Sequence, residues 1–320
     1  LVRNDVARVD LGGIAVLRGT GADRMVFLHR LTTGSVQGTR VGAGCFSLLL
    51  DSKGHIIGDL RICVKTNQVS LLVAAAAGQG IVAAINRYAV MDDFALAVEP
   101  ETSMTALCGP GSAEALRAAG VVVPNGLKGE PVWSHAEATS PIGRFWLVRS
   151  HDLGADGLWV FGGAAAFAAL TARWDQVGVP ILASPVAEAL RIEAGEPRFG
   201  HEITGDTFPM EVGLAGALDQ NKGCYLGQET IVRVRDRGLV RRRLVELRLA
   251  GDEMPALGDG IAFEQAPAAG RITSVGCIPG HPPVALALLA TKVPVGAEVQ
   301  VNHGNTTLFA QVVFDRPPWQ

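Results

Sequence analysis

The sequence lacks the short motifs that mark several common enzyme classes. It contains no Walker motif and no Gly-x-Ser-x-Gly elbow, and the glycines of Arg18–Gly21 have no strand–GxGxxG–helix frame around them. Hydrolysis of nucleoside triphosphates on a P-loop, α/β-hydrolase chemistry and a dinucleotide-binding fold are therefore not indicated.

Cysteine is scarce and widely spaced. The chain has 320 residues and five cysteines, and no two of them lie within three residues of each other. This spacing excludes a CxxC-type motif and predicts reduced thiols in a cytosol-like compartment. His29, His55 and His201 stand alone, without the second His or Cys that a zinc site needs. We therefore predict no metal site.

Charge is also sparse. Charged residues make up 18% of the chain, hydrophobic residues 48%, and the formal net charge is −3. The near-balance of charge argues against a nucleic-acid-binding protein with a globally basic face. The apolar content predicts large ordered cores rather than disorder.

No hydrophobic run is long enough to suggest a membrane segment. The most apolar stretch, Val69–Ile85, is interrupted at residues 78–80 and falls short of the roughly 20 residues that a spanning helix needs. A strand followed by a helix explains it better. The N-terminal residues also lack the basic region and apolar core of a signal peptide. We expect a cytoplasmic protein that contacts neither membrane nor nucleic acid.

What the sequence does contain is an alternation of strand and helix patterns as far as residue 240. Strands and helices interleave with hairpin signals such as Asp51–Gly54, which predicts an α+β fold rather than a regular βαβ repeat. The expected helices cover residues 21–31, 79–88, 111–119, 164–177, 185–194 and 228–237. The expected strands cover residues 13–17, 46–50, 56–64, 69–75, 94–98, 105–108, 145–149 and 157–161.

From residue 241 the pattern changes to short strands separated by Gly and Pro turns. The expected strands are 243–249, 260–263, 270–277, 283–289, 298–301 and 306–313. We therefore predict a small all-β module over residues 241–320, following a mixed region over residues 1–240.

A carboxylate stands at the expected end of one helix. Ser184 and Pro185 predict an N-cap and a first helical residue, and Gly195 is a plausible residue just past the C-terminal end. Glu193 then lies in the last turn, where the helix dipole disfavours an acid. Either Glu193 serves a specific partner, or it faces solvent and pairs with Arg191 or Arg198.

The segment Lys222–Glu229 predicts a turn that leads into a helix ended by Gly238. Cys224 would lie just ahead of the helix N-terminus and two residues from Lys222, and both features favour a thiolate. A packed, inert cysteine explains the same residue types equally well.

Six arginines fall within eleven residues. On the expected helix Arg233 and Arg237 share a face, and guanidinium groups can grip a carboxylate through two parallel hydrogen bonds. They suggest an anionic ligand, although a solvated face with ion pairs to Asp236 and Glu246 is an open alternative. Nucleic acid is less favoured, because Tyr225 is the sole aromatic residue nearby that could stack on a base.

Taken together, Arg191–Gly238 resembles a signature shared by two branches of the GcvT superfamily. These are the glycine-cleavage T-protein (aminomethyltransferase) and the YgfZ-like folate-binding proteins of iron–sulfur cluster maintenance. The motifs run in order as Arg-x-Glu-x-Gly, Phe-Gly-His-Glu, Pro-Met-Glu, Lys-Gly-Cys-Tyr-x-Gly-Gln-Glu and Arg…Arg-Gly. The Lys-Gly-Cys-Tyr form resembles the YgfZ-like branch, since T-proteins typically carry Phe and no Cys there. Ala22–Thr33 and Asp51–Leu60 are similar to the N-terminal helix and hairpin of the superfamily.

The resemblance implies a fold and a ligand. It implies two intertwined, ferredoxin-like α+β lobes over residues 1–240 that form a central folate cavity, and a C-terminal β-barrel over residues 241–320. The implied cofactor is tetrahydrofolate or a derivative. Glu193 would accept hydrogen bonds from the pterin ring, Arg233 would hold the glutamate end, and Tyr225 and Lys222 would line the site.

One departure from the T-protein pattern bears on chemistry. T-protein hairpins end in two consecutive aspartates, whereas this chain has Gly58 and Asp59. Proton transfer during aminomethyl transfer needs an acid or base at the reacting nitrogen. The sequence therefore favours a tetrahydrofolate-binding protein that supports assembly or repair of iron–sulfur enzymes and contacts them transiently. Cys224, with Asp59, is its candidate catalytic group. The alternative is a folate-dependent aminomethyltransferase or methylated-amine demethylase.

Overall fold

The computed structural model describes residues 4–10, 13–100, 102–127, 129–238 and 240–315. The chain forms two compact units, each assembled from separate stretches. Unit 1 comprises the chain up to Leu49 together with Gly58–Leu182 and Asp219–Tyr225. Unit 2 comprises Leu50–Ile57, Ala183–Leu218 and the chain from Leu226 onward.

One five-stranded sheet of unit 1 has the order β3-β4-β5-β2-β6. Its strands are β2 (Ile14–Thr20), β3 (Gly44–Leu50), β4 (Ile56–Val64), β5 (Val69–Ala74) and β6 (Ala95–Val98), and its helices are α1 (Arg24–Leu31) and α2 (Gly78–Asn86). Gly58 lies against Ile81 of α2, and Asp59 belongs to the opposite face because neighbouring strand residues point to opposite sides.

The other sheet of unit 1 has the order β1-β7-β10-β9-β8. Its strands are β1 (Ala7–Val9), β7 (Ser103–Cys108), β8 (His135–Ser140), β9 (Gly143–Asp152) and β10 (Ala155–Gly162), and its helices are α3 (Ser112–Ala118) and α4 (Ala164–Gln176). Leu116 of α3 and Trp174 of α4 pack with Leu147 and Val160 in one buried cluster. The sequence did not predict β1 and β8, since one has three residues and the other alternates polar and small side chains without a large apolar residue.

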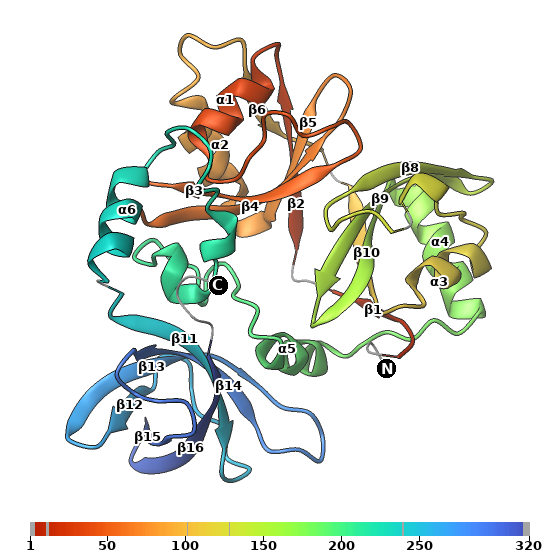
Figure 1. Ribbon diagram of the computed structural model, residues 1–320. Coiled ribbons are helices and arrows are strands. Elements are labelled where there is room, and N and C mark those ends of the chain that lie inside the picture. The colour runs from red at the N-terminus through yellow and green to blue at the C-terminus, as the bar shows by residue number, and fades with distance from the viewer. Residues whose placement is uncertain (1–3, 11–12, 101, 128, 239, 316–320) are drawn as a thin grey trace. The chain divides into compact units, whose positions relative to one another are not determined.

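Unit 2 contains the C-terminal β-barrel, and the predicted barrel is confirmed. Six antiparallel strands close in the order β11-β14-β13-β12-β15-β16 (Figure 1, blue strands). They are β11 (Arg242–Leu249), β12 (Gly260–Phe263), β13 (Ala266–Gly276), β14 (Val284–Ala290), β15 (Glu298–His303) and β16 (Thr306–Asp315). Inward-facing Val, Leu, Ile and Ala side chains fill the interior. The predicted boundary at residue 240 stays a prediction, since the compact unit that holds the barrel also takes in earlier stretches.

Two helices of unit 2 carry predicted site residues: α5 (Ser184–Glu193) and α6 (Gln228–Arg237). Helix α5 lies on the barrel at Gly276, where a Cβ would come within 2.7 Å of the Ala189 Cα. The predicted N-cap at Ser184 is wrong: the helix begins with Ser184, and Ala183 is the extended residue before it. Helix α6 has the predicted bounds, ending at Gly238 with φ of 61°.

Four short 3-10 helices complete the described structure: Ala75–Ala77, Asn125–Leu127, η3 (Pro209–Val212) and η4 (Ala215–Ala217). Within the described residues, no helix is long and apolar enough to cross a membrane.

Candidate functional site

In unit 1, Lys222 fastens the segment Asp219–Tyr225 to the end of α1. Its ammonium group donates hydrogen bonds to the carbonyl oxygens of Gly34 (2.8 Å), Thr32 and His29. Carbonyls at a helix C-terminus lack partners within the helix and favour a cation. Lys222 therefore caps α1, although 190 residues separate it from Thr32.

This geometry changes the role expected for Lys222. An ammonium group has three N–H donors, and all three are used by carbonyl oxygens. Burial lowers the pKa of Lys222 to about 8, an effect that the nearby Asp219 opposes. In this structure Lys222 fixes the backbone of the signature segment and has no further N–H donor to offer a ligand.

Cys224 and Tyr225 follow this anchor. Cys224 is exposed and its thiol is not in a disulfide, and the half-buried ring of Tyr225 lies 5.5 Å from the Lys222 Nζ. The Lys222 ammonium points to α1, and its charge acts on the thiol of Cys45. Burial raises the pKa of Cys45 to about 11, and Lys222 opposes that rise. The exposed position of Cys224 rules out the alternative of a packed cysteine.

Asp59 lies on the other face of β4, beside Arg61. Arg61 donates to Oδ2 of Asp59 at 2.5 Å, and the Asp59 side chain is 7% exposed. The second carboxylate oxygen, Oδ1, is buried and has no hydrogen-bond partner among the described residues, and the same holds for Nε of Arg61. A buried polar atom without a partner costs roughly 1–3 kcal/mol. Asp59 thus offers an acceptor for a group that the chain itself does not supply.

Three aromatic rings surround the Arg61 guanidinium. Its carbon lies 5.2 Å from the ring centre of Phe46, 5.5 Å from that of Trp133 and 5.7 Å from that of Trp159. These cation–π contacts restrict the guanidinium and, through it, the orientation of Asp59. This cluster was not predicted from the sequence. The alternating Asp59-x-Arg61 spacing was a usable signal, but nothing in the sequence brings Trp133 and Trp159 to it.

The structure also revises the argument drawn from Gly58. A Cβ at this position would come within 2.6 Å of the Ile81 side chain, so residue 58 faces α2. An aspartate there would not share a face with Asp59. The absence of an acid at residue 58 therefore removes nothing from the face on which Asp59 lies.

In unit 2, a buried ion network fixes the end of α5 where Glu193 lies. Arg191 donates to Glu188 (2.8 Å), to Glu202 (3.2 Å) and to the Ser274 hydroxyl (2.6 Å). Arg198 donates to Glu188 as well, at 2.8 Å. The arginines on either side of Glu193 are thus engaged with Glu188 and Glu202, and they hold the backbone of α5.

Glu193 itself is half-buried and lies near another acid. Burial raises the pKa of Glu246 on β11, and the negative charge of Glu193 raises it further. Two neighbouring carboxylates favour the arrival of a cation or an N–H donor. This electrostatic setting is compatible with the ligand-binding role predicted for Glu193.

Arg233 has the ion pair that its spacing predicted, with Glu229 at 2.6 Å. The two side chains are 54% and 86% exposed, so the pair contributes at most about 0.5 kcal/mol and can yield to a ligand. The predicted pairing with Asp236 is made by Arg235. Glu246, the other expected partner, instead lies 3.8 Å from Arg248.

The remaining arginines of the cluster differ in burial. Arg242 binds Glu211 at 2.8 Å and Arg243 binds Asp315 at 2.8 Å, so both are structural. Arg237 and Arg241 are exposed and form no ion pair within the described part of the chain. In the same described residues, no group of His, Cys, Asp and Glu could hold a metal ion.

Comparison with known proteins identifies the family. The family model described as the GCVT N-terminal domain matches residues 1–222. An aminomethyltransferase of Corynebacterium jeikeium is 28% identical over 319 residues, which cover 90% of this chain and 80% of that protein. A chloroplastic protein of Arabidopsis thaliana, provisionally named a transferase, is 28% identical over 262 residues. That match covers 79% of this chain and 58% of the plant protein, so the chain spans less than two thirds of it.

The fold agrees with the family that the sequence comparisons identify. The crystal structure of the glycine cleavage system aminomethyltransferase T from Bartonella henselae superposes with a TM-score of 0.86 at 22% identity, covering 98% of this chain and 86% of that one. At this identity the likeness shows the fold alone, and the fold is that of an aminomethyltransferase-like protein. The chain therefore belongs to the family that the GCVT N-terminal domain defines.

Proposed function

We propose that this protein binds tetrahydrofolate and that Asp59 contributes to the binding. The observation that carries the proposal is the buried Oδ1 of Asp59, which has no partner among the described residues while Arg61 holds the other oxygen. A reduced pterin is rich in N–H donors, and such a donor would satisfy this oxygen. When bound, tetrahydrofolate would supply the one-carbon carrier chemistry of the family.

Glu193 is the second residue to which we assign folate binding. Its neighbour Glu246 makes an N–H donor favourable at this place, and the Arg191 network keeps the end of α5 in position. Arg233 remains our candidate for the carboxylate end of the ligand, because its pair with Glu229 is exposed and weak. Tyr225 stays a candidate lining residue, whereas we assign Lys222 to positioning.

Calorimetric titration of tetrahydrofolate tests the binding residues. We expect Glu193→Gln and Asp59→Asn each to weaken binding by roughly 10–100-fold, because a hydrogen bond to a charged group contributes about 1.5–3 kcal/mol. Glu298→Gln, an exposed substitution on β15, is the matched control and should bind as wild type does. Equal affinities in all four proteins would overturn the assignment.

Within this binding function, we propose a role in assembly or repair of iron–sulfur enzymes, with Cys224 as the active thiol. The support is the exposure of Cys224 on a segment whose backbone is fixed by Lys222. In cells that lack the native gene, Cys224→Ala should fail to restore the activities of iron–sulfur enzymes. Cys277→Ala, a half-buried thiol of the barrel, is the control and should restore them. Full restoration by Cys224→Ala would remove this role.

A second candidate function is folate-dependent aminomethyl or methyl transfer. It gains support from Asp59, because this acid lies on the face of β4 that residue 58 does not share. Relatives named aminomethyltransferase point the same way. The assay supplies tetrahydrofolate with an aminomethylated lipoyl carrier or a methylated amine. Formation of a one-carbon folate that Asp59→Asn abolishes would support it, and no folate product from the wild type would exclude it.

A further inference from the structure

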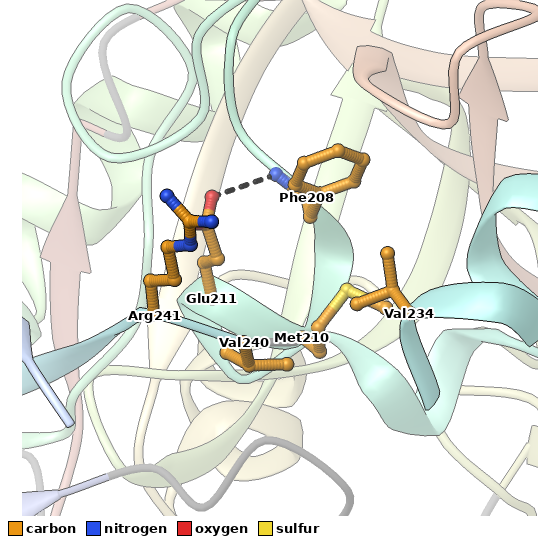
Figure 2. Close-up of a pocket in the computed structure, with 6 residues that line it drawn as sticks. All are labelled: Phe208, Met210, Glu211, Val234, Val240 and Arg241. Carbon is orange, nitrogen blue, oxygen red and sulfur yellow. Dashed lines mark hydrogen bonds between the residues drawn. The ribbon is translucent and has the colours of Figure 1, made fainter. Parts of the chain in front are cut away.

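A pocket of about 250 Å³ lies wholly within unit 2. It is formed by η3, the second half of α6 and the residues that lead into β11. Its lining residues are Phe208, Met210, Glu211, Val234, Val240 and Arg241 (Figure 2). No function considered above uses this pocket.

Four of the six lining side chains are apolar. Met210 is fully buried, and Val234 and Val240 are half-buried beside it. Phe208 is held from behind by His55, whose ring centre lies 4.7 Å away. The wall is therefore built from fixed hydrocarbon surface, and an apolar ligand group could gain roughly 25 cal/mol for each Å² that it buries there.

The negative charge of the pocket is already matched. Glu211 accepts from Nε of Arg242 at 2.8 Å, from Nη2 of Arg242 at 3.1 Å and from the Phe208 backbone N–H at 3.1 Å, the last of which Figure 2 shows as a dashed line. Both carboxylate oxygens thus have donors. Glu211 therefore has a structural role in the pocket wall and does not require a cationic ligand.

The positive charge is not matched. Arg241 is exposed at the pocket and has no ion pair within the described residues, although the adjacent Arg242 has two acidic partners. Arg237 follows Val234 by three residues on α6, which places it on the same side of the helix, and it likewise has no ion pair in the described part. An anion at Arg241 would therefore bind a guanidinium that no acid among the described residues occupies.

We propose that this pocket binds a small organic anion with an apolar body, namely an alkyl or aryl carboxylate. The carboxylate lies on Arg241, and the hydrocarbon part contacts Met210, Val234 and Val240. The pocket is smaller than the roughly 300–1,000 Å³ of sites for drug-sized ligands, so the occupant is a compact acid. The site is separate from the folate-binding residues assigned above and does not depend on that proposal.

The test uses the full chain and 3-phenylpropionate as the probe. Titration followed by methyl NMR should show saturable shifts of the Met210, Val234 and Val240 signals, with a Kd of about 1 mM, as expected for a ligand of this size. The uncharged 3-phenylpropionamide should bind about tenfold more weakly, because it cannot form a charge-assisted pair with Arg241.

Two variants make the test specific. Arg241→Gln should abolish the preference for the acid over the amide and leave the affinity for tetrahydrofolate unchanged. Arg248→Gln removes another exposed arginine, on β11 and outside the pocket lining, and is the control, so it should keep the preference. The proposal fails if the probe shifts no pocket signal, if Arg241→Gln keeps the preference for the acid, or if saturating tetrahydrofolate displaces the probe.

Discussion

The two units differ in how they hold some of their buried positive charges. In unit 2, Arg191, Arg242 and Arg243 are each bound by full carboxylates. In unit 1, the ammonium of Lys222 rests on three carbonyl oxygens, and that of Lys65 lies 3.7 Å from the ring centre of Trp146. Carboxylates thus hold these three cations of unit 2, whereas Lys222 and Lys65 of unit 1 lie on dipoles and an aromatic face. Unit 1 also contains ion pairs of its own, Arg8–Asp175 and Arg61–Asp59.

The two arrangements differ in the energetic cost of removing the cation. Loss of a cation in unit 2 leaves a buried anion without compensation, which is costly in a medium of low dielectric constant. Loss of Lys222 in unit 1 leaves carbonyl oxygens without donors, which costs less because no net charge is stranded. Both anchors adjoin a proposed functional residue, Glu193 in one case and Cys224 in the other. Substituting an anchor should therefore change stability, whereas substituting the neighbouring functional residue should change function.

The largest effect is expected for Arg191→Met. This change strands the fully buried Glu202 and should lower the free energy of unfolding by about 3–5 kcal/mol. Urea unfolding followed by circular dichroism measures it. Adding Glu202→Gln should recover part of the loss, since the stranded charge is then removed. A loss below about 1 kcal/mol would show that the Arg191 network is not the anchor of α5.

Lys222→Met should cost somewhat less, about 3 kcal/mol, because three carbonyl oxygens at the end of α1 lose their donors. Lys292→Met, an exposed substitution, is the control and should change stability by less than about 0.5 kcal/mol. Hydrogen exchange at α1 gives a local measurement. Unchanged protection of α1 in Lys222→Met would contradict the capping role.

His135 extends the comparison to pH. Its Nε2–H donates to the Val64 carbonyl and its Nδ1 accepts from the indole N–H of Trp146, so the folded chain requires the neutral ring. Burial, together with the charge of Lys65, lowers the pKa of His135 from 6.5 to about 4. Between these two values the unfolded chain binds more protons, so stability is full above pH 6.5 and falls as the pH falls.

The measurement is urea unfolding at pH 7 and at pH 5. Wild type should lose about 2 kcal/mol more than His135→Gln between these pH values, since glutamine stays neutral while keeping a donor and an acceptor. Equal losses in the two proteins would show that protonation of His135 does not cause the loss of stability at low pH.

The smallest effect is expected at Cys224. Because the thiol is exposed, Cys224→Ser should change the free energy of unfolding by less than about 0.5 kcal/mol. Thermal unfolding of Cys224→Ser and of Lys222→Met, measured side by side, would then distinguish the structural role of Lys222 from the role of the exposed thiol. A destabilisation above about 1 kcal/mol would give Cys224 a structural role instead.

Regular elements were the part of the fold that local sequence physics could predict. Strand β4 and helix α6 have the predicted bounds. A hairpin turn marks the start of β4, and Gly238 marks the end of α6. Gly and Pro turns separated the barrel strands correctly except between β12 and β13, which are joined at Glu264 and Gln265, while Pro267 lies within β13. Strands β1 and β8 were missed since tertiary pairing, rather than their own pattern, holds them in a sheet.

The candidate site was predictable only where the interacting residues lie close together in the sequence. The Glu229–Arg233 pair followed from helical spacing and is confirmed. The hydrogen bonds of Lys222 to the end of α1, and the contacts of Arg61 with the Trp133 and Trp159 rings, join residues about 70 to 190 positions apart, which no local pattern reports. The folate-binding and thiol roles of Glu193, Tyr225 and Cys224 stay predictions.

The interleaving of the chain has a consequence for how the protein is made. Unit 1 receives its last stretch at Asp219–Tyr225, whereas unit 2 already includes Leu50–Ile57. Translation at about 5–20 residues per second delivers Lys222 roughly 10–40 s after the carbonyls of α1 that it caps. Neither unit is a single run of consecutive residues. Neither unit can therefore mature on the ribosome before most of the chain has emerged, and a gene split at any single point would divide at least one of them.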